Sequence, residues 1–464
     1  MVILVSYLGG EAYGLLGPQI AATIIQNHSP YDCVVIAVTK EDNKGFLKKC
    51  LADYFGPERP MIAFSYLSGR EDLYRFAKEL KEEGAMTILA GPQADVDYLG
   101  EREWQEHSHR FHGLSSFFSL AVHGPAERIL PFLRTCEKGH PDRLPGMLWM
   151  DRGGALQRKP GSPPWDPSFL RNVSWDNLFR LGKNGISPKK IETGQVLWQI
   201  GCPHAALEVQ GQIAYPSFMG GPEKGTIRIP LRGCSFCDVA VDKGFCGALD
   251  METVIRQIQM LPGGEDGRKI AFELINENAL PGLSRLLLAV TNRKILLSQI
   301  NLTLRADWLA CHEAGLRQAL NTAKGIGIRI FLGSVGFESF DDTILANLNK
   351  GLDVAVNLEA VKLMRRMKEE FPDHWGYSRK EGAVHGFIHP TPWDTRETEA
   401  ANQKNIGLYG LNFDILPEHS TPLIIHHASP LGDWIREIEL REAVQFKREG
   451  TIIGWWQVGD RFVL

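Results

Sequence analysis

The sequence predicts an α/β protein with more than one domain: a doubly wound parallel sheet, then a full or partial (β/α) barrel and a small C-terminal cap. Three observations support this. The chain has 464 residues, more than one ordinary core accommodates. Apolar runs of strand length alternate with amphipathic stretches of helix length in both halves. Proline and glycine interrupt this alternation between about residues 139 and 190, which predicts a domain boundary.

Composition excludes several classes of function. Apolar residues make up 44% of the chain, charged residues 23%, and the net charge is −4, so no nucleic-acid partner is expected. The sequence has no run of eighteen apolar residues, so no membrane partner is expected. Met1–Val5 has the character of a first strand rather than of a signal peptide. The eight cysteines lack the rhythm of a disulfide framework. We therefore expect a cytoplasmic protein whose clustered thiols bind metal or do chemistry.

The N-terminal domain, residues 1–140, is predicted to be the doubly wound sheet. Its small-residue loops lie at the strand carboxyl ends, where such sheets bind ligands. No GxGxxG fingerprint follows the first strand, so these loops suit a large flat ligand better than a dinucleotide, although plain tight turns explain them too. The candidate strands are Val2–Leu8, Cys33–Thr39, Met61–Leu67, Met86–Ala90 and Leu120–His123, with a helix at Glu71–Glu83.

A wrapping linker is expected over residues 141–190, a parallel barrel over 191–423 and the cap over 424–464. The predicted barrel strands are Thr226–Leu231, Ile270–Ile275, Leu296–Leu304, Ile328–Gly333, Val384–Ile388 and Leu411–Leu416. The predicted helices between them are Met251–Leu261, Leu283–Thr291, Asp307–Ala319, Asp342–Leu348 and Val356–Glu370. Barrel chemistry belongs at the carboxyl ends of the strands.

A cysteine-bearing loop follows the first of those strands. Cys234 and Cys237 are close enough in sequence to turn both sulfurs toward one metal, with Phe236 between them to exclude water. A third thiolate at Cys246 would leave a fourth position open, as in an iron–sulfur cluster with one uncapped iron. A zinc knuckle or a pair of buried thiols fits the spacing equally well.

Six motifs, in this order along the chain, resemble those of cobalamin-dependent radical S-adenosylmethionine enzymes. They are the turns Gly91–Gln93 and Gly124–Glu127, the linker hairpin Leu144–Gly146, the cysteine loop Arg232–Asp238, the segment Gly336–Ser339 with Leu348–Gly351 after it, and Gly386–Pro390. The resemblance covers most of the chain.

The resemblance implies that the N-terminal domain is a Rossmann-like cobalamin-binding domain. The chain lacks an Asp-x-His-x-x-Gly motif, so base-off cobalamin without a histidine on its lower face is implied. The residues expected to bind it are Gly10, Ser65, Tyr66, Leu67, Gly91, Pro92, Gln93, Gly124, Pro125 and Glu127.

The resemblance also implies a [4Fe–4S] cluster that binds S-adenosylmethionine. The family's loop has three thiols, whereas this loop has two, so a third ligand must come from elsewhere. Cys246 is expected to join Cys234 and Cys237, with Cys202 as the runner-up. The residues expected at S-adenosylmethionine are Phe236, Arg305, Ser334 and Glu338.

Two of these residues have roles that the chemistry suggests. Glu338 is expected to bind the ribose hydroxyls, and Arg305 to pair with the cofactor's carboxylate unless it forms a structural salt bridge. His389 and Trp393 are weak candidates for the walls of a substrate pocket, and packing is the alternative for both. His385, His426 and His427 are expected to be satisfied histidines of the core or of a pocket rather than metal ligands.

The implied activity is methyl transfer from S-adenosylmethionine, by way of methylcobalamin, to an unactivated carbon of a small molecule such as a natural-product or cofactor precursor. The implied electron donor is a flavodoxin or ferredoxin. Two alternatives stay open. One is a radical cyclase or rearrangement enzyme with the same cofactors, and the other is a non-catalytic cobalamin- or zinc-binding sensor.

Overall fold

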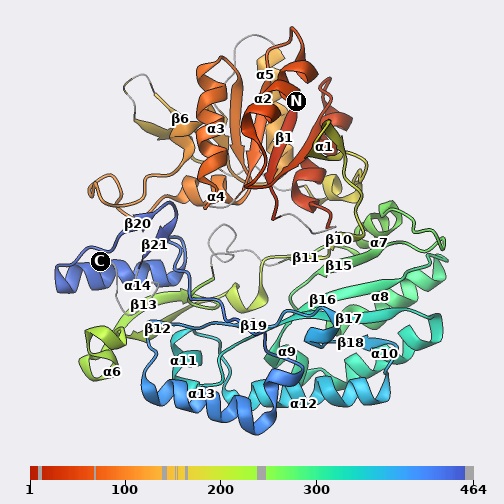
Figure 1. Cartoon of the computed structure of the whole chain (residues 1–464), viewed down its shortest axis with the longest axis vertical. Helices are drawn as coiled ribbons and strands as arrows, with labels where there is room; N and C mark the ends of the chain where they lie inside the picture. Colours follow the sequence, from red (N-terminus) through yellow and green to blue (C-terminus); the bar gives the residue numbers. More distant parts are fainter. Residues whose placement is uncertain are drawn as a thin grey trace. The chain divides into compact units, whose positions relative to one another are not determined.

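The computed structural model describes the chain except for residues 9–12, 67–68, 138–143, 152, 154, 162–165, 238–246 and 455–464. Its contacts divide it into two compact units. One comprises Met1–Gln195 with Met260–Pro262, and the other comprises Val196–Gln259 with Gly263–Leu464 (Figure 1). Both units combine helices with sheets of largely parallel strands, which confirms the predicted α/β class.

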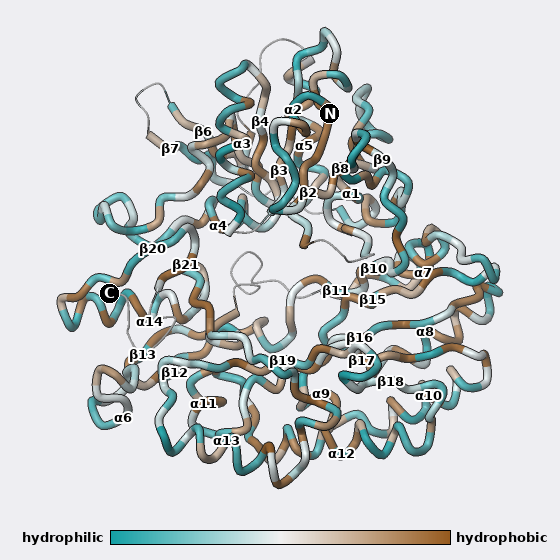
Figure 2. Tube along the Cα trace, viewed as in Figure 1, coloured by the Kyte–Doolittle hydropathy of each residue, from teal (hydrophilic) through white to brown (hydrophobic). Residues whose placement is uncertain are grey.

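The first unit contains a nine-stranded sheet in the order β7-β6-β5-β4-β3-β1-β2-β8-β9. Its five central strands are parallel and follow the order 2-1-3-4-5, so the direction of winding reverses between β1 and β3. These strands are apolar and buried, as a sheet covered on both faces requires, and β1 is hydrophobic over most of its length (Figure 2). They are β1 (Val2–Ser6), β2 (Val34–Val38), β3 (Met61–Ser65), β4 (Met86–Ala90) and β5 (Leu120–Val122).

Five helices accompany this sheet, and two hairpins extend it. The hairpin β6–β7 pairs with β5, while the hairpin β8–β9 pairs with β2. The segment expected to be a linker therefore supplies strands to both edges of the first sheet. The helices are α1 (Leu16–His28), α2 (Lys44–Phe55), α3 (Glu71–Glu82), α4 (Pro92–Leu99) and α5 (Ile129–Glu137), and the hairpin strands are β6 (Met147–Met150), β7 (Leu156–Arg158), β8 (Leu178–Gly182) and β9 (Gly185–Pro188).

A second sheet runs in the order β10-β15-β16-β17-β18, and β19 also pairs with β17. The pairs that join β15, β16, β17, β18 and β19 are all parallel, and among the described residues they trace an open path of strands. The strands are β10 (Thr193–Leu197), β15 (Ala271–Ile275), β16 (Gln299–Arg305), β17 (Arg329–Glu338), β18 (Trp375–Gly376) and β19 (Gly386–Phe387).

The five helices predicted in the second unit are present close to their predicted bounds, whereas those at Gly221–Lys224 and Arg396–Tyr409 were not predicted. The helix expected at Asp307–Ala319 is divided into α9 and α10 at His312. The described helices of this unit are α6 (Gly221–Lys224), α7 (Met251–Met260), α8 (Leu280–Asn292), α9 (Ala306–Cys311), α10 (Glu313–Ile326), α11 (Asp342–Asn347), α12 (Val354–Glu370), α13 (Arg396–Tyr409) and α14 (Pro430–Glu442). Short antiparallel pairs join β11 (Gln199–Ile200) to β14 (Gly247–Ala248) and β20 (Arg448–Glu449) to β21 (Ile452–Ile453).

Two predicted barrel strands are wrong. Thr226–Leu231 does form a strand, β13 (Thr226–Arg232), but β13 pairs antiparallel with β12 (Glu208–Ala214) in a separate sheet. Its exposed and buried residues alternate, the pattern of a ribbon with one wet face rather than of a buried parallel strand. Leu411–Leu416 is not a strand, because α13 ends at Gly410 with a φ of +61° and a 3₁₀ turn (Leu411–Phe413) follows.

The predicted C-terminal cap packs against the β12–β13 hairpin. Trp434 of α14 is fully buried, and its ring centroid lies 5.4 Å from that of Trp393. The same apolar cluster contains Ile227, Ile229 and Leu231, the inward residues of β13. This packing explains why the alternate residues of β13 are apolar.

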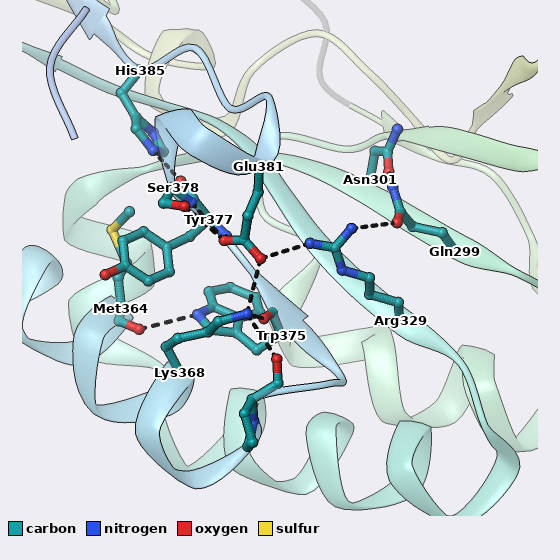
Figure 3. A network of polar contacts seen from close by, with 11 residues as sticks. Gln299, Asn301, Arg329, Met364, Lys368, Trp375, Tyr377, Ser378, Glu381 and His385 are labelled. Carbon is teal, nitrogen blue, oxygen red and sulfur yellow. Dashed lines mark hydrogen bonds and ion pairs between the residues drawn. The ribbon is translucent and has the colours of Figure 1, made fainter. Parts of the chain in front are cut away.

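A polar network fixes the amino end of β17 (Figure 3). The Glu381 carboxylate accepts hydrogen bonds from Arg329 of β17 at 2.8 Å, from Lys368 of α12 at 2.9 Å and from the Ser378 hydroxyl at 2.9 Å. Lys368 also donates to the carbonyl of Trp375 at 2.8 Å. The network therefore ties α12 and the loop after β18 to the central strand of the second sheet.

We predict that Glu381→Gln makes the protein less stable at neutral pH. Burial opposes ionisation of Glu381, but the bonds from Lys368 and Ser378 outweigh it and lower its pKa from 4.5 to about 2. The carboxylate therefore stabilises the fold above pH 4.5, and this contribution disappears as pH falls toward 2. We expect the variant to lose about 1–2 kcal/mol in urea unfolding at pH 7, and less at pH 3.

The matched control is Glu359→Gln, whose carboxylate pairs with Lys362 on the exposed surface of α12. We expect this control to unfold as the wild type does at both pH values. An equal loss for the two variants at pH 7 would contradict the assignment of a stabilising role to Glu381.

Candidate functional site

Charged side chains gather at the carboxyl ends of three neighbouring parallel strands in the second unit. Arg305 is the last residue of β16, Glu338 is the last residue of β17, and Glu277 follows β15 by two residues. Burial raises the pKa of Glu277 above its ordinary value, although Lys350 and Arg305 act to lower it. The sequence analysis missed Glu277, although an acid directly after a buried strand was the available signal.

Arg305 is held rigidly at this edge. Its side chain is buried, and its Nε and Nη2 atoms donate to the two carboxylate oxygens of Asp307 at 3.0 and 3.2 Å. Nη2 also donates to the carbonyl of Lys350 at 2.5 Å, and Nη1 donates to the Sγ atom of Cys234 at 3.4 Å. Arg305 thus forms the structural salt bridge that the sequence left open as an alternative to binding a cofactor's carboxylate.

Glu338 occupies a strained and crowded position. Its φ is +63°, which non-glycine residues rarely adopt and which is found most often at functional sites. A Cβ on Gly336 would lie 2.6 Å from one carboxylate oxygen, and a Cβ on Gly386 would lie 2.8 Å from the other. Lys350, itself only 3% exposed, pairs with this carboxylate at 3.3 Å. The two glycines and Lys350 therefore fix the position of the carboxylate.

The cysteine loop is attached to the turn Asn347–Gly351, which follows α11. The Ser235 backbone N–H donates to the carbonyl of Leu348 at 2.9 Å, and its hydroxyl donates to the carbonyl of Asn347 at 2.8 Å. The Asn349 side-chain amide donates to the carbonyl of Gly233 at 2.6 Å. This turn therefore holds the backbone on both sides of Cys234.

A second cysteine-bearing turn packs against the same place. It contains Cys202 and continues into the 3₁₀ turn Pro203–Ala205. A Cβ on Gly233, whose φ is +67°, would lie 2.9 Å from the Cβ of Ala205, and His204 forms a hydrogen bond to the carbonyl of Asn349 at 3.0 Å. Burial raises the pKa of the Cys202 thiol. The charges of Glu277 and Cys234 raise this pKa further, whereas a hydrogen bond from the backbone at His204 lowers it.

The structure places the other predicted residues of this region in different surroundings. Cys234 and Cys237 lie in one turn, with the Cys237 N–H donating to the Cys234 carbonyl at 3.1 Å. Cys246, the expected third ligand, lies outside the described residues. Phe236 packs against the C-terminal apolar cluster, and Ser334 lies within β17 rather than at its end.

His389 and Trp393 differ in exposure. The His389 side chain is 40% exposed and pairs with Asp394 at 3.0 Å, a contact that raises its pKa. Trp393 is 2% exposed, and its indole N–H donates to the carbonyl of Ala214 at 3.1 Å. Trp393 therefore has the packing role that the sequence analysis gave as its alternative. The predicted core histidine His385 is satisfied by Val335 and Tyr377.

The first unit contains a cavity of about 600 Å³, within the range of sites for small molecules and cofactors. One face of β1, β3, β4 and β5 forms one wall, and residues of α1 and α5 form the other. The cavity reaches the point between β1 and β3 where the winding reverses, which is where sheets of this order bind ligands. Its described lining is mainly apolar.

Six of the residues predicted to bind cobalamin line this cavity: Ser65, Tyr66, Gly91, Pro92, Gly124 and Pro125. Gly91 has a φ of +69°, and a Cβ there would lie 2.6 Å from the Ser65 hydroxyl. The Tyr66 hydroxyl is buried without a hydrogen-bond partner, and burial raises its pKa. Gln93 and Glu127 are not in the described wall, and Gly10 and Leu67 lie outside the described residues.

Two carboxyl groups of α4, missed by the sequence analysis, support the loops at this edge. Asp95 accepts hydrogen bonds from His123 at 2.7 Å and from the Gly124 N–H at 2.9 Å. Asp97 is buried and accepts from the Ser115 hydroxyl at 2.5 Å and from Gln93 at 2.8 Å. Burial raises the pKa of Asp97 from 3.8 to about 6, although these bonds oppose the shift.

In the described part of the chain, no helix is both long and apolar enough to span a membrane. Comparison with known proteins finds no protein family whose model matches this chain and no significant match among curated proteins.

We predict that Asp97 makes the first unit less stable as pH rises from 4 to 6. Its folded pKa, about 6, is higher than the value of 3.8 expected when it is unfolded. The folded state therefore binds the proton more tightly, and the stability that this provides is lost above pH 6. Asp97→Asn should remove this part of the pH dependence, measured by thermal unfolding between pH 4 and 7.

The control for this measurement is Asp53→Asn on the exposed face of α2. It should keep the wild-type pH dependence. If Asp97→Asn keeps it too, the burial of Asp97 does not determine the pH response.

Proposed function

We propose that this chain is a cobalamin-dependent radical S-adenosylmethionine enzyme, and that it transfers a methyl group to an unactivated carbon of a small molecule. The observation that carries the proposal is the meeting of Cys202, Cys234, Arg305 and Glu338 at the carboxyl ends of the second sheet's strands. Bound cofactors would supply the electron from the cluster and the methyl carrier in the corrin, and the chain itself would supply positioning.

The residues of the second unit fit an iron–sulfur cluster better than a single zinc ion. Where the chain is described, no group of three potential ligands that includes a cysteine has its ligand atoms within 4.8 Å of one another. A mononuclear zinc site needs such closeness, because each Zn–S bond is about 2.3 Å. A cluster distributes its thiolates over different irons and needs wider spacing. The Arg305 N–H that donates to Cys234 is also the kind of contact that surrounds cluster sulfurs.

Glu338 supports the proposed binding of S-adenosylmethionine. Its carboxylate is fixed between Gly336 and Gly386, one strand away from Arg305, and it pairs with Lys350. A fixed carboxylate can accept two hydrogen bonds from neighbouring hydroxyl groups, as a ribose would present them. The two glycines leave room for the carboxylate itself, which would clash with a side chain at either position.

The cavity of the first unit supports the cobalamin proposal. It lies at the switch point of the sheet, and its edge is made by backbone at Gly91 and Gly124, where a bulky ligand can approach. The Ser65 side chain lines the cavity and carries a hydroxyl group that can form a hydrogen bond to a ligand there. These features suit a wide ligand that carries amide groups at its rim.

For the third cluster ligand, the described residues support Cys202, the runner-up of the sequence analysis, whereas Cys246 lies outside the described residues. Cys202 follows β11, the short strand that comes after β10 of the second sheet, and it begins the segment that ends in Cys234 and Cys237. Its turn also packs directly on Gly233. We therefore propose Cys202, Cys234 and Cys237 as the thiolates, with the β12–β13 hairpin inserted between the first and the second.

We predict that Cys202→Ala, Cys234→Ala and Cys237→Ala each lose the cluster, because three thiolates are the minimum that holds it with one iron open. Iron and acid-labile sulfide are measured after anaerobic reconstitution. Cys246→Ala and Cys311→Ala should keep wild-type amounts. Full iron in Cys202→Ala together with loss in Cys246→Ala would restore the expectation from the sequence.

We predict that Gly17→Leu weakens cobalamin binding by about tenfold or more. Gly17 lines the cavity, and a Cβ there meets nothing within 4 Å, so a leucine would enter the space while favouring helix α1. Hydroxocobalamin binding is measured by its visible absorbance after gel filtration. Gly407→Leu, at an exposed helical glycine with the same free space, is the control. Unchanged binding in Gly17→Leu would exclude this cavity.

The reaction itself is tested with S-adenosylmethionine that carries a labelled methyl group. Label in the product identifies methyl transfer, whereas a product formed without label identifies a cyclase or rearrangement enzyme. Purified protein with zinc and without sulfide would refute the enzyme proposal and favour a sensor.

A further inference from the structure

The guanidinium of Arg305 has one N–H group directed at sulfur. Its Nε and Nη2 atoms donate hydrogen bonds to the Asp307 carboxylate, and Nη2 also donates to the carbonyl of Lys350. Nη1 donates to the Sγ atom of Cys234 at 3.4 Å, a normal distance for a hydrogen bond to sulfur. Because two other groups hold the guanidinium from the opposite side, its direction toward Cys234 is set before any cofactor binds.

The charge of Arg305 is maintained in this buried place. The Asp307 carboxylate pairs with the guanidinium at 3.0 Å, and an arginine side chain stays protonated in proteins. Arg305 also lies over the ring of Trp308, 5.2 Å from its centroid, which favours a cation. The residue is 5% exposed, so water screens its field only weakly.

We propose that Arg305 is a positioning residue that raises the reduction potential of the cluster by hydrogen bonding to the Cys234 thiolate. The inference rests on the proposed function. Reduction adds one electron to the cluster and moves no proton, so the reduced form is more negative by one charge. A fixed cation with an N–H group on a ligand sulfur stabilises that form more than the oxidised form.

The test compares Arg305→Gln and Arg305→Lys with the wild type, all reconstituted and without S-adenosylmethionine. Dithionite supplies the electron, and the midpoint potential is followed by electron paramagnetic resonance. We expect Arg305→Gln to move the potential to a more negative value, because it loses the charge. Arg305→Lys should move it less, because it keeps the charge but loses the planar fork. Arg293→Lys, at an exposed arginine paired with Glu252, should leave it unchanged.

Each outcome has a distinct meaning. An unchanged or more positive potential in Arg305→Gln, with wild-type iron and sulfide, would overturn the inference and leave the proposed function intact. Loss of iron from both Arg305 variants would overturn it too, since Arg305 would then be needed to assemble the cluster. A wild-type protein that holds no iron or sulfide would instead refute the proposed function itself.

Discussion

The turn Asn347–Gly351 is the constraint on which the second unit's candidate site depends. Its carbonyl groups and the Asn349 amide bind the backbone on both sides of Cys234. Its Lys350 reaches Glu338 with the side chain and Arg305 with the carbonyl. Buried polar groups of this kind are stable only when each has a partner. The cysteine loop and the acid of the neighbouring strand therefore cannot move independently of this turn.

The same burial explains the balance of charge around the turn. Arg305 and Lys350 are nearly inaccessible to water, and an unpaired buried cation would cost several kcal/mol. Asp307 and Glu338 pair with them directly. Burial also raises the pKa of Glu277, the third charged residue at this edge, although Lys350 and Arg305 act to lower it. Each of the two buried cations therefore has a carboxylate partner, and Arg305 also donates an N–H to the sulfur of Cys234.

Apolar runs in the sequence predicted the fold well where burial on both faces decided it. The predicted bounds lie close to the observed ones for β1 to β5, β15, β16 and β17. Prediction failed for β13 because length and apolarity were weighed above alternation, which marks an antiparallel ribbon. Contacts such as Arg305 with Cys234, or Asp97 with Ser115, join residues 71 and 18 positions apart, so no local pattern reveals them.

The cavity in the first unit shows how tight turns and a binding edge can share one cause. Gly91 must be glycine, because its positive φ and its closeness to Ser65 exclude a side chain. The same bare backbone leaves the edge open to a ligand, so the two interpretations of these loops do not compete. The described lining contains no lysine, arginine, aspartate or glutamate side chain. In its described part, this wall therefore offers a ligand mainly apolar contact and no charged side chain.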